Sequence, residues 1–124
     1  MEGIKRLPAA EFDVMKALWN MPVPATSSEV MAQLEKTGRE WKPQTLLTLL
    51  TRLEKKGFLT SEKPGKERLY TPQIEQQAYM RVETRAFLSK FEHSSATAFV
   101  SALFDEKGLS EADITELKDW LNKR

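Results

Sequence analysis

Cysteine is absent from the sequence, and histidine occurs once, at position 93. The lack of cysteine excludes disulfides and a thiol nucleophile, and with a single histidine it excludes an ordinary zinc site. We therefore expect no metal and no cofactor. No apolar run approaches the roughly 20 residues of a membrane span, and the N-terminal MEGIKRLPAAEF has no hydrophobic signal core. These absences predict a cytoplasmic protein without a membrane segment.

The sequence also lacks an arrangement typical of a catalytic site. His93 stands in a serine-rich turn without a base or nucleophile that would pair with it, so we expect it at the surface or at a helix start. Glu35 with Glu40, or residues 27–29 (Ser-Ser-Glu), offer carboxylates and hydroxyls but no complete acid–base or nucleophile set. No glycine-rich phosphate loop occurs. We predict that the protein is not an enzyme.

An excess of one charge is missing overall, because the net charge of the 124 residues is only +1. The distribution is uneven, however. Residues 1–38 carry a net charge of −1, residues 39–68 carry +4 and residues 69–124 carry −2. A local positive patch, more than the total charge, is what attracts a polyanion such as DNA.

The most regular hydrophobic pattern lies within residues 41–58. Four leucines, Leu46, Leu49, Leu50 and Leu53, recur at the spacing of one face of a helix. Pro43 stands at the first position of the expected helix, where its missing N–H costs nothing. Gly57 follows the last basic pair of the segment, as is typical of a helix end. We predict a helix over residues 43–56.

The opposite face of this helix carries short hydroxyls, an amide and long cations, without a carboxylate. Such side chains bind phosphate oxygens and base edges, and arginine is the usual reader of guanine. The alternative is an ordinary solvated surface helix. Because the flanking segments are also basic, we predict a helix that enters the DNA major groove, with contacts from Gln44, Thr45, Thr48, Arg52 and Lys55.

Two shorter helices are predicted before it. The first opens at Leu7-Pro8, and we expect its buried stripe to be Phe12, Met15, Leu18 and Trp19. A turn with two prolines follows at residues 21–24. Thr26 with a glutamate three residues later forms a capping box that begins the second helix, whose inward face includes Val30 and Leu34 and which ends at residues 37–38.

A two-stranded hairpin is predicted after the groove helix. Residues 58–63 and 68–71 are short and partly alternating, and a Pro-Gly turn lies between them. Three helices followed by a basic hairpin are the order of a winged helix-turn-helix domain, which we place at residues 1–72. A lone hairpin is marginal in water, so Phe58, Leu69 and Tyr70 should pack it on the helices. Lys66 and Arg68 of the wing, residues 62–69, are predicted phosphate contacts.

The remaining residues, 73–124, read as three helices, of which the last begins at Ser110 as its cap. They carry many aromatics and leucines for so short a segment. We predict a helical domain that packs on a second copy of itself; the alternative is that it folds back on the first domain. The predicted dimerisation residues are Phe87, Phe91, Phe99, Leu103, Phe104, Leu117, Trp120 and Leu121.

The sequence resembles the penicillinase-repressor family (BlaI/MecI) over nearly its whole length. The residues that carry the resemblance are Ala10-Glu11-Phe12-Asp13-Val14-Met15 with Leu18-Trp19, Trp41-x-Pro43-x-Thr45, Thr48-Leu49-Leu50-x-Arg52-Leu53-x-Lys55-Lys56-Gly57, Tyr70-x-Pro72, and Leu109-Ser110 with Leu117 and Leu121-Asn122-Lys123.

The resemblance implies a homodimeric transcriptional repressor, with a winged helix on palindromic operator DNA and a C-terminal helical dimerisation domain. It makes Thr45, Thr48 and Arg52 groove residues, and Lys66 and Arg68 wing contacts. It also implies a membrane sensor whose metalloprotease activity leads to cleavage in the dimerisation domain.

Two positions depart from the family pattern. The family often has serine where this chain has Lys42, which cannot cap the helix and which we expect to reach a phosphate instead. The antibiotic-sensing members are cleaved at an Asn-Phe pair, and the matching pair here is Ala102-Leu103. The sequence therefore predicts a mainly α protein with a small β hairpin that represses transcription on operator DNA. Release by cleavage, by a ligand or by a partner stays open, as does the alternative of a winged helix used only for protein contacts.

Overall fold

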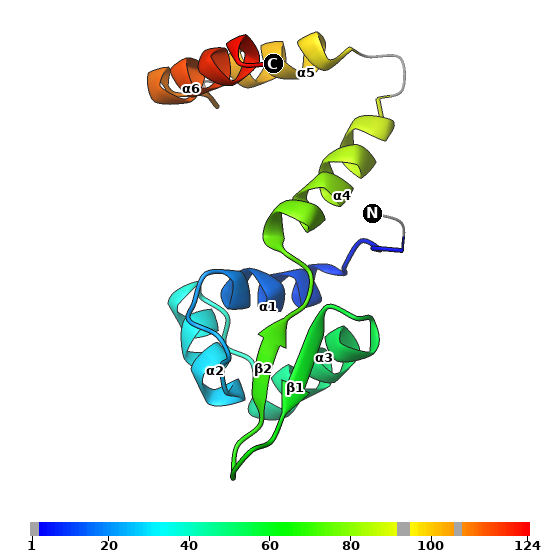
Figure 1. The fold of residues 1–124 in the computed structure, drawn as a ribbon, viewed down its shortest axis with the longest axis vertical. Helices are drawn as coiled ribbons and strands as arrows, with labels where there is room; N and C mark the ends of the chain where they lie inside the picture. Colours follow the sequence, from blue (N-terminus) through cyan, green and yellow to red (C-terminus); the bar gives the residue numbers. More distant parts are fainter. Residues whose placement is uncertain (1–2, 92–94, 106–107) are drawn as a thin grey trace. The chain divides into compact units, whose positions relative to one another are not determined.

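The computed structural model describes residues 3–91, 95–105 and 108–124 and is mainly α-helical with one hairpin, as predicted (Figure 1). The elements in order are α1 (Ala9–Trp19), α2 (Ser27–Lys36), α3 (Pro43–Lys55), β1 (Leu59–Glu62), β2 (Leu69–Pro72), α4 (Gln76–Ser89), α5 (Ala96–Asp105) and α6 (Glu111–Asn122). The chain forms two compact units, unit 1 (Met1–Ala86) and unit 2 (Phe87–Arg124).

The predicted helix ends are confirmed by hydrogen bonds and backbone angles. Thr26 and Glu29 form the capping box of α2: the Glu29 N–H donates to the Thr26 hydroxyl at 3.1 Å, and the Thr26 N–H donates to the Glu29 carboxylate at 2.8 Å. Ser110 and Asp113 form the same arrangement at the start of α6. After α3, Gly57 has a φ of +85°, a conformation that side chains disfavour, so glycine ends the helix there at little cost.

The hairpin of unit 1 is antiparallel, with Leu59 opposite Pro72 and Glu62 opposite Leu69. A third extended segment joins it, because Ala25 and Tyr70 exchange backbone hydrogen bonds of 3.0 and 2.8 Å. The link between α1 and α2 therefore pairs with β2 as it enters α2. Three helices, this bridge and the hairpin form a winged helix-turn-helix.

Unit 1 holds every fully buried hydrophobic side chain of the described residues. The four leucines of α3 are all buried, and Met15, Leu18, Val30 and Leu34 meet them from α1 and α2. Phe12 and Trp19 are partly buried and pack against this core, so the predicted stripe of α1 faces the core along its length. Val14, which the stripe omitted, is also fully buried.

Most of α4, up to Ala86, belongs to unit 1, where it completes the core. Tyr79 is 1% exposed, and its ring lies 5.5–5.8 Å from the rings of Phe12, Trp19 and Phe58. The backbone of Leu7 donates to the Tyr79 hydroxyl at 2.7 Å. Residue 72, where the sequence suggested a domain boundary, thus lies inside unit 1, and the boundary between the two units falls after Ala86.

The Tyr79 hydroxyl also donates to Glu83 at 2.5 Å, and Glu83 pairs with Arg6 at 2.9 Å. Burial, and then the hydrogen bond to Glu83, raise the pKa of Tyr79 to about 12. The tyrosine is therefore neutral at physiological pH and ties the N-terminal segment to α4.

Unit 2 consists of the end of α4 with α5 and α6. No residue of α5 or α6 is buried in the described part of either helix. The ring of Phe87 lies 5.4 Å from the ring of Phe91 and 5.5 Å from the ring of Phe99, measured between ring centres. The prediction of three helices after residue 72 is confirmed, while His93 lies outside the described residues.

Candidate nucleic-acid interface

The predicted reading residues all lie on the exposed side of α3. Its four leucines fill one side, and Gln44, Thr45, Thr48, Arg52 and Lys55 are each exposed. The sequence thus separates the helix into one face that packs and one face that is open to a ligand. Thr51 lies on the same exposed side.

Two threonine hydroxyls on this face are held by the helix itself. Thr48 donates to the carbonyl of Gln44 at 3.0 Å, and Thr51 donates to the carbonyl of Leu47 at 2.9 Å. Each hydroxyl proton is committed, so the oxygen is left as an acceptor. An acceptor and a methyl group suit an exocyclic amine and the thymine methyl in the major groove.

The start of α3 confirms the expected absence of a side-chain cap. Lys42 occupies the N-cap position with extended backbone angles, and its side chain makes no cap hydrogen bond. Its carbonyl accepts from the N–H groups of Thr45 and Leu46 at 3.0 and 3.3 Å. The Lys42 side chain is exposed beside this turn, where a cation is able to meet a phosphate.

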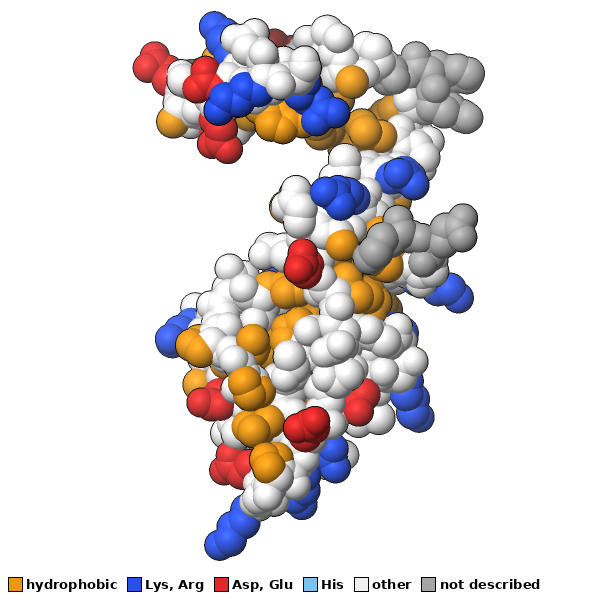
Figure 2. Space-filling view, in the orientation of Figure 1, with side chains coloured by type: hydrophobic (Ala, Val, Ile, Leu, Met, Phe, Trp, Pro, Cys, Tyr) orange, Lys and Arg blue, Asp and Glu red, His pale blue; other side chains and the backbone are white. Residues whose placement is uncertain are grey.

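The wing is joined to α3 by polar side chains. Arg68 donates to the Ser61 hydroxyl at 3.0 Å, and Ser61 donates to Glu54 of α3 at 2.8 Å. Glu54 is thus turned toward the wing, which leaves the reading face without a carboxylate. Lys63 and Lys66, near the turn of the hairpin, are exposed, and Figure 2 shows basic side chains gathered at this end of unit 1.

Two cations of the basic segment are exposed but already paired with carboxylates of the protein. Of the eight Lys and Arg side chains in residues 39–68, Arg39 pairs with Asp13 and Lys56 pairs with Glu11, both carboxylates of α1. Sequence reasoning missed these pairs, because the partners lie far apart along the chain. The cations that are exposed without a recorded pair to α1 are Lys42, Arg52, Lys55, Lys63, Lys66 and Arg68.

The predicted dimerisation residues are spread over unit 2. Phe99, Leu103 and Leu117 are half-buried within it. The exposed members, at 44–56%, are Phe87, Phe91, Phe104, Trp120 and Leu121. Figure 2 shows hydrophobic side chains along this unit, and an open pocket of about 180 Å³ between its aromatic rings is lined by Phe87, Leu88, Phe91, Phe99 and Ala102. Ala102-Leu103, the pair that the resemblance aligned with the cleavage site of the family, lies inside α5.

Other site types find no support in the part of the chain that the structure describes. No group of His, Asp and Glu there is arranged to hold a metal ion. No helix among the described residues combines the length and the apolar character needed to cross a bilayer.

The fold and the open polar face of α3 define the class, a winged helix-turn-helix protein. The sequence profile of the family described as "Penicillinase repressor" matches residues 7–123. The chain belongs to this family of transcriptional repressors, as the resemblance indicated.

Relatives of known name agree with this assignment. The chain is 35% identical to a penicillinase repressor of Bacillus licheniformis over 123 residues, which are 99% of this chain and 94% of the relative. It is 30% identical to the methicillin resistance regulatory protein MecI of Mammaliicoccus sciuri over 118 residues, 95% of this chain and 94% of that protein.

Two solved structures share the fold of unit 1. One is the DNA-binding domain of the repressor BlaI, with a TM-score of 0.53 and 39% identity, covering 64% of this chain and 94% of that one. The other is monomeric BlaI of Bacillus licheniformis in complex with the blaP half-operator, with a TM-score of 0.51 and 39% identity, covering 61% and 90%.

Proposed function

We propose that this chain, a DNA-binding transcriptional repressor by family, acts in the cytoplasm as a homodimer on palindromic operator DNA. Each protomer lays α3 in one major groove and rests its wing on the adjacent backbone. The observation that carries the proposal is the open face of α3, with its exposed cations and threonines and no carboxylate. A BlaI structure with a half-operator, on a domain 39% identical to unit 1, supports DNA as the partner.

Within this face, Arg52 is the proposed guanine reader. It is exposed on the third turn of α3, and a bidentate contact to guanine is worth roughly 1–3 kcal/mol against a wrong base. Thr45 and Thr48 lie nearer the helix N-terminus, the end that usually meets base edges. Lys42, Lys66 and Arg68 are the proposed phosphate contacts, about six per dimer, and Lys55 is a further proposed DNA contact on the open face of α3.

The exposed hydrophobic side chains of unit 2 support the proposed dimer. Trp120 and Leu121 are more than half exposed in a single chain, and covering them with a second copy removes their apolar area from water. Two bound copies then occlude the promoter from polymerase. The proposed step that releases DNA is a change in unit 2. Because the matched Ala102-Leu103 pair differs from the cleaved Asn-Phe pair, this change could be caused by a ligand or a partner as well as by the sensor-protease pathway.

The test is a titration of palindromic sites selected from genomic DNA with full-length protein, comparing Arg52→Ala with Arg81→Ala. Both variants remove one exposed arginine, so the total charge change is matched. Because each protomer of the dimer loses one contact of about 1–3 kcal/mol, we expect Arg52→Ala to lose about 2–6 kcal/mol of binding free energy, roughly 30-fold or more in affinity, and Arg81→Ala to change little.

The salt dependence of the same binding separates operator recognition from protein contacts. With about six phosphates neutralised per dimer, log affinity should fall against log salt with a slope of about −5. Equal affinities for both variants would remove Arg52 from the reading surface. A slope near zero, with no shift of duplex DNA, would instead favour a winged helix used for protein contacts.

A further inference from the structure

The helix proposed to read DNA does not fix its own start. Lys42 provides no side-chain cap, and Pro43 at the first helical position has no N–H to donate. A missing cap costs about 1 kcal/mol of helix stability and leaves the first turn free to fray. The direction of α3 decides which side chains reach base edges, so the structure must hold this end from outside the helix.

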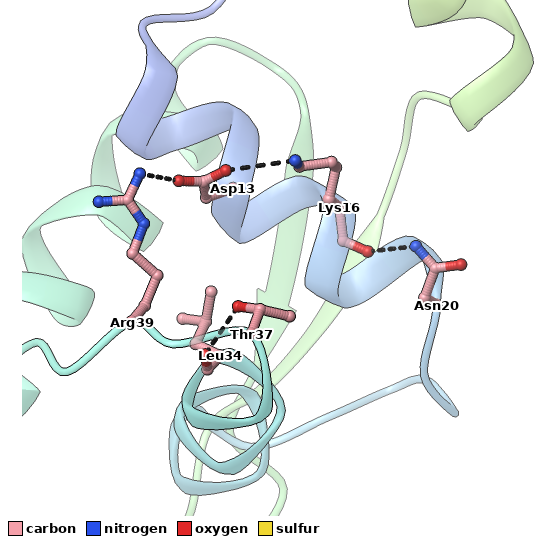
Figure 3. A network of polar contacts seen from close by, with 6 residues as sticks. All are labelled: Asp13, Lys16, Asn20, Leu34, Thr37 and Arg39. Carbon is pink, nitrogen blue, oxygen red and sulfur yellow. Dashed lines mark hydrogen bonds and ion pairs between the residues drawn. The ribbon is translucent and has the colours of Figure 1, made fainter. Parts of the chain in front are cut away.

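Arg39 supplies the anchor before α3. Its guanidinium donates to the carboxylate of Asp13 on α1 (Figure 3) and lies over the ring of Trp41, 5.1 Å from the ring centre. Its own N–H donates to the carbonyl of Leu34 at 3.1 Å. Arg39 thereby joins the end of α2, the side of α1 and the residue two positions before Pro43.

Lys56 supplies the anchor at the other end. It is the C-cap residue of α3, and its ammonium group lies 2.5 Å from a carboxylate oxygen of Glu11 on α1. Glu11 is only 3% exposed, whereas the Lys56 side chain is 41% exposed. A carboxylate so buried is normally paired, so this contact fixes the end of α3 against the start of α1.

We propose that Glu11 and Asp13 are positioning residues, which hold the two ends of α3 at the angle that operator binding requires. In this arrangement Arg39 and Lys56 face α1 and do not contact DNA. The proposal rests on the proposed function. Its consequence has a definite sign: removing a carboxylate from a DNA-binding unit should strengthen binding by simple charge attraction, yet loss of either anchor weakens operator binding.

The experiment compares Asp13→Asn with two controls in full-length protein. Glu40→Gln removes the same charge next to Arg39, at an exposed position for which the described residues show no ion pair. Lys16→Gln removes the second partner of Asp13, which lies at 3.4 Å, while leaving the Arg39 contact in place. Asp13→Glu is the conservative variant, since it keeps a carboxylate that is able to reach Arg39.

The first readout is hydrogen exchange of the Thr45 and Leu46 amides without DNA. We expect exchange roughly two- to fivefold faster in Asp13→Asn, because a partly exposed ion pair contributes at most about 1 kcal/mol, and wild-type rates in both controls and in Asp13→Glu. Arg39→Lys, which keeps the charge but loses the planar fork and the stacking on Trp41, should also exchange faster. Glu11→Gln should accelerate exchange in the last turn of α3.

The second readout is the ratio of affinities for operator and scrambled duplex. Partial unfolding lowers both affinities equally, whereas a misdirected α3 lowers only the first. We expect this ratio to fall roughly three- to tenfold in Asp13→Asn, with the salt slope unchanged and recovery in Asp13→Glu. Glu40→Gln should bind both duplexes slightly more tightly.

Two results would overturn the proposal in distinguishable ways. If the wild type binds operator but Asp13→Asn matches Glu40→Gln in exchange and in the affinity ratio, the positioning role is wrong and the proposed function stands. If the wild type binds no selected duplex, the proposed function fails, and the positioning role fails with it.

Discussion

The two units of the chain treat their hydrophobic residues in opposite ways. In unit 1, Val30, Leu50 and Tyr79 are at most 1% exposed, whereas in unit 2 Trp120 and Leu121 are 53% and 56% exposed. Both units carry helices of similar length, so the difference lies in packing partners and not in helix formation. The contrast teaches that unit 1 has a complete core within one chain, while unit 2 leaves large apolar side chains uncovered, which is the basis of the proposed homodimer.

The strongest way to break this comparison is to make unit 2 polar. Trp120→Ser combined with Leu121→Ser should leave unit 1 folded but convert the dimer to monomer, because the apolar area that drives association is gone. Affinity for a palindromic operator should fall by about 100-fold or more, since two linked binding events become one, while half-site affinity stays near the wild type.

Sedimentation and operator titration measure both effects. Val23→Ser is the matched control, since Val23 is an exposed hydrophobic residue of unit 1 at 43%. A double variant that remains a dimer with wild-type affinity would show that α6 is not the surface that a second copy covers.

The substitution Tyr79→Phe tests the other side of the comparison, the complete core of unit 1. This substitution leaves the Leu7 N–H, which donates to the Tyr79 hydroxyl at 2.7 Å, without its acceptor, and an unpaired buried donor costs about 1–3 kcal/mol. Chemical denaturation should show this loss in unit 1. The dimer should be unaffected, because Tyr79 lies outside unit 2.

The same tyrosine predicts a dependence of stability on pH. Its folded pKa of about 12 exceeds the ordinary value of 10.0, so its stabilising effect is complete below pH 10 and is lost as pH rises toward 12. The free energy of unfolding should fall by up to about 1.4 kcal/mol per pH unit in that window. Burial also raises the pKa of Tyr70, so Tyr70→Phe should keep most of this fall, whereas Tyr79→Phe should lose most of it. If the two variants lost stability equally between pH 10 and 12, the proposed role of the Tyr79 hydroxyl would be contradicted.

The smallest expected effect comes from Lys42→Ser. A serine at this N-cap position is able to accept an N–H of the first turn, which should stabilise unit 1 by about 1 kcal/mol. The salt slope of operator binding should become less negative by about 2 per dimer, because each protomer loses one phosphate contact. Lys36→Ser, at an exposed position in the last turn of α2, should change neither quantity.

Much of unit 1 could be predicted because its signals are local. The leucine spacing of α3, the Thr26 capping box and the glycine at position 57 each act within a few residues, and each is confirmed. Tyr79 and Glu11 were missed for the opposite reason. Tyr79 accepts from Leu7, 72 positions away, and Glu11 pairs with Lys56, 45 positions away, and neither pairing leaves a mark in the local sequence.

The candidate site divides in the same way. Which side of α3 is open was predictable from the leucines that cover its other side. Which cations are unpaired was not predictable. Arg39 and Lys56 pair with carboxylates of α1, and nothing in the local sequence around those carboxylates indicates these distant partners. The reading residues therefore follow from periodicity, and their orientation follows from tertiary contacts.

The most direct test of the account is a comparison of backbone amide exchange in full-length protein with and without its selected operator. We predict added protection in residues 42–55 and in the wing, residues 62–69, with the same residues affected in both copies of a dimer. Unchanged exchange throughout α3 when the operator is saturated would contradict the claim that its open face reads DNA.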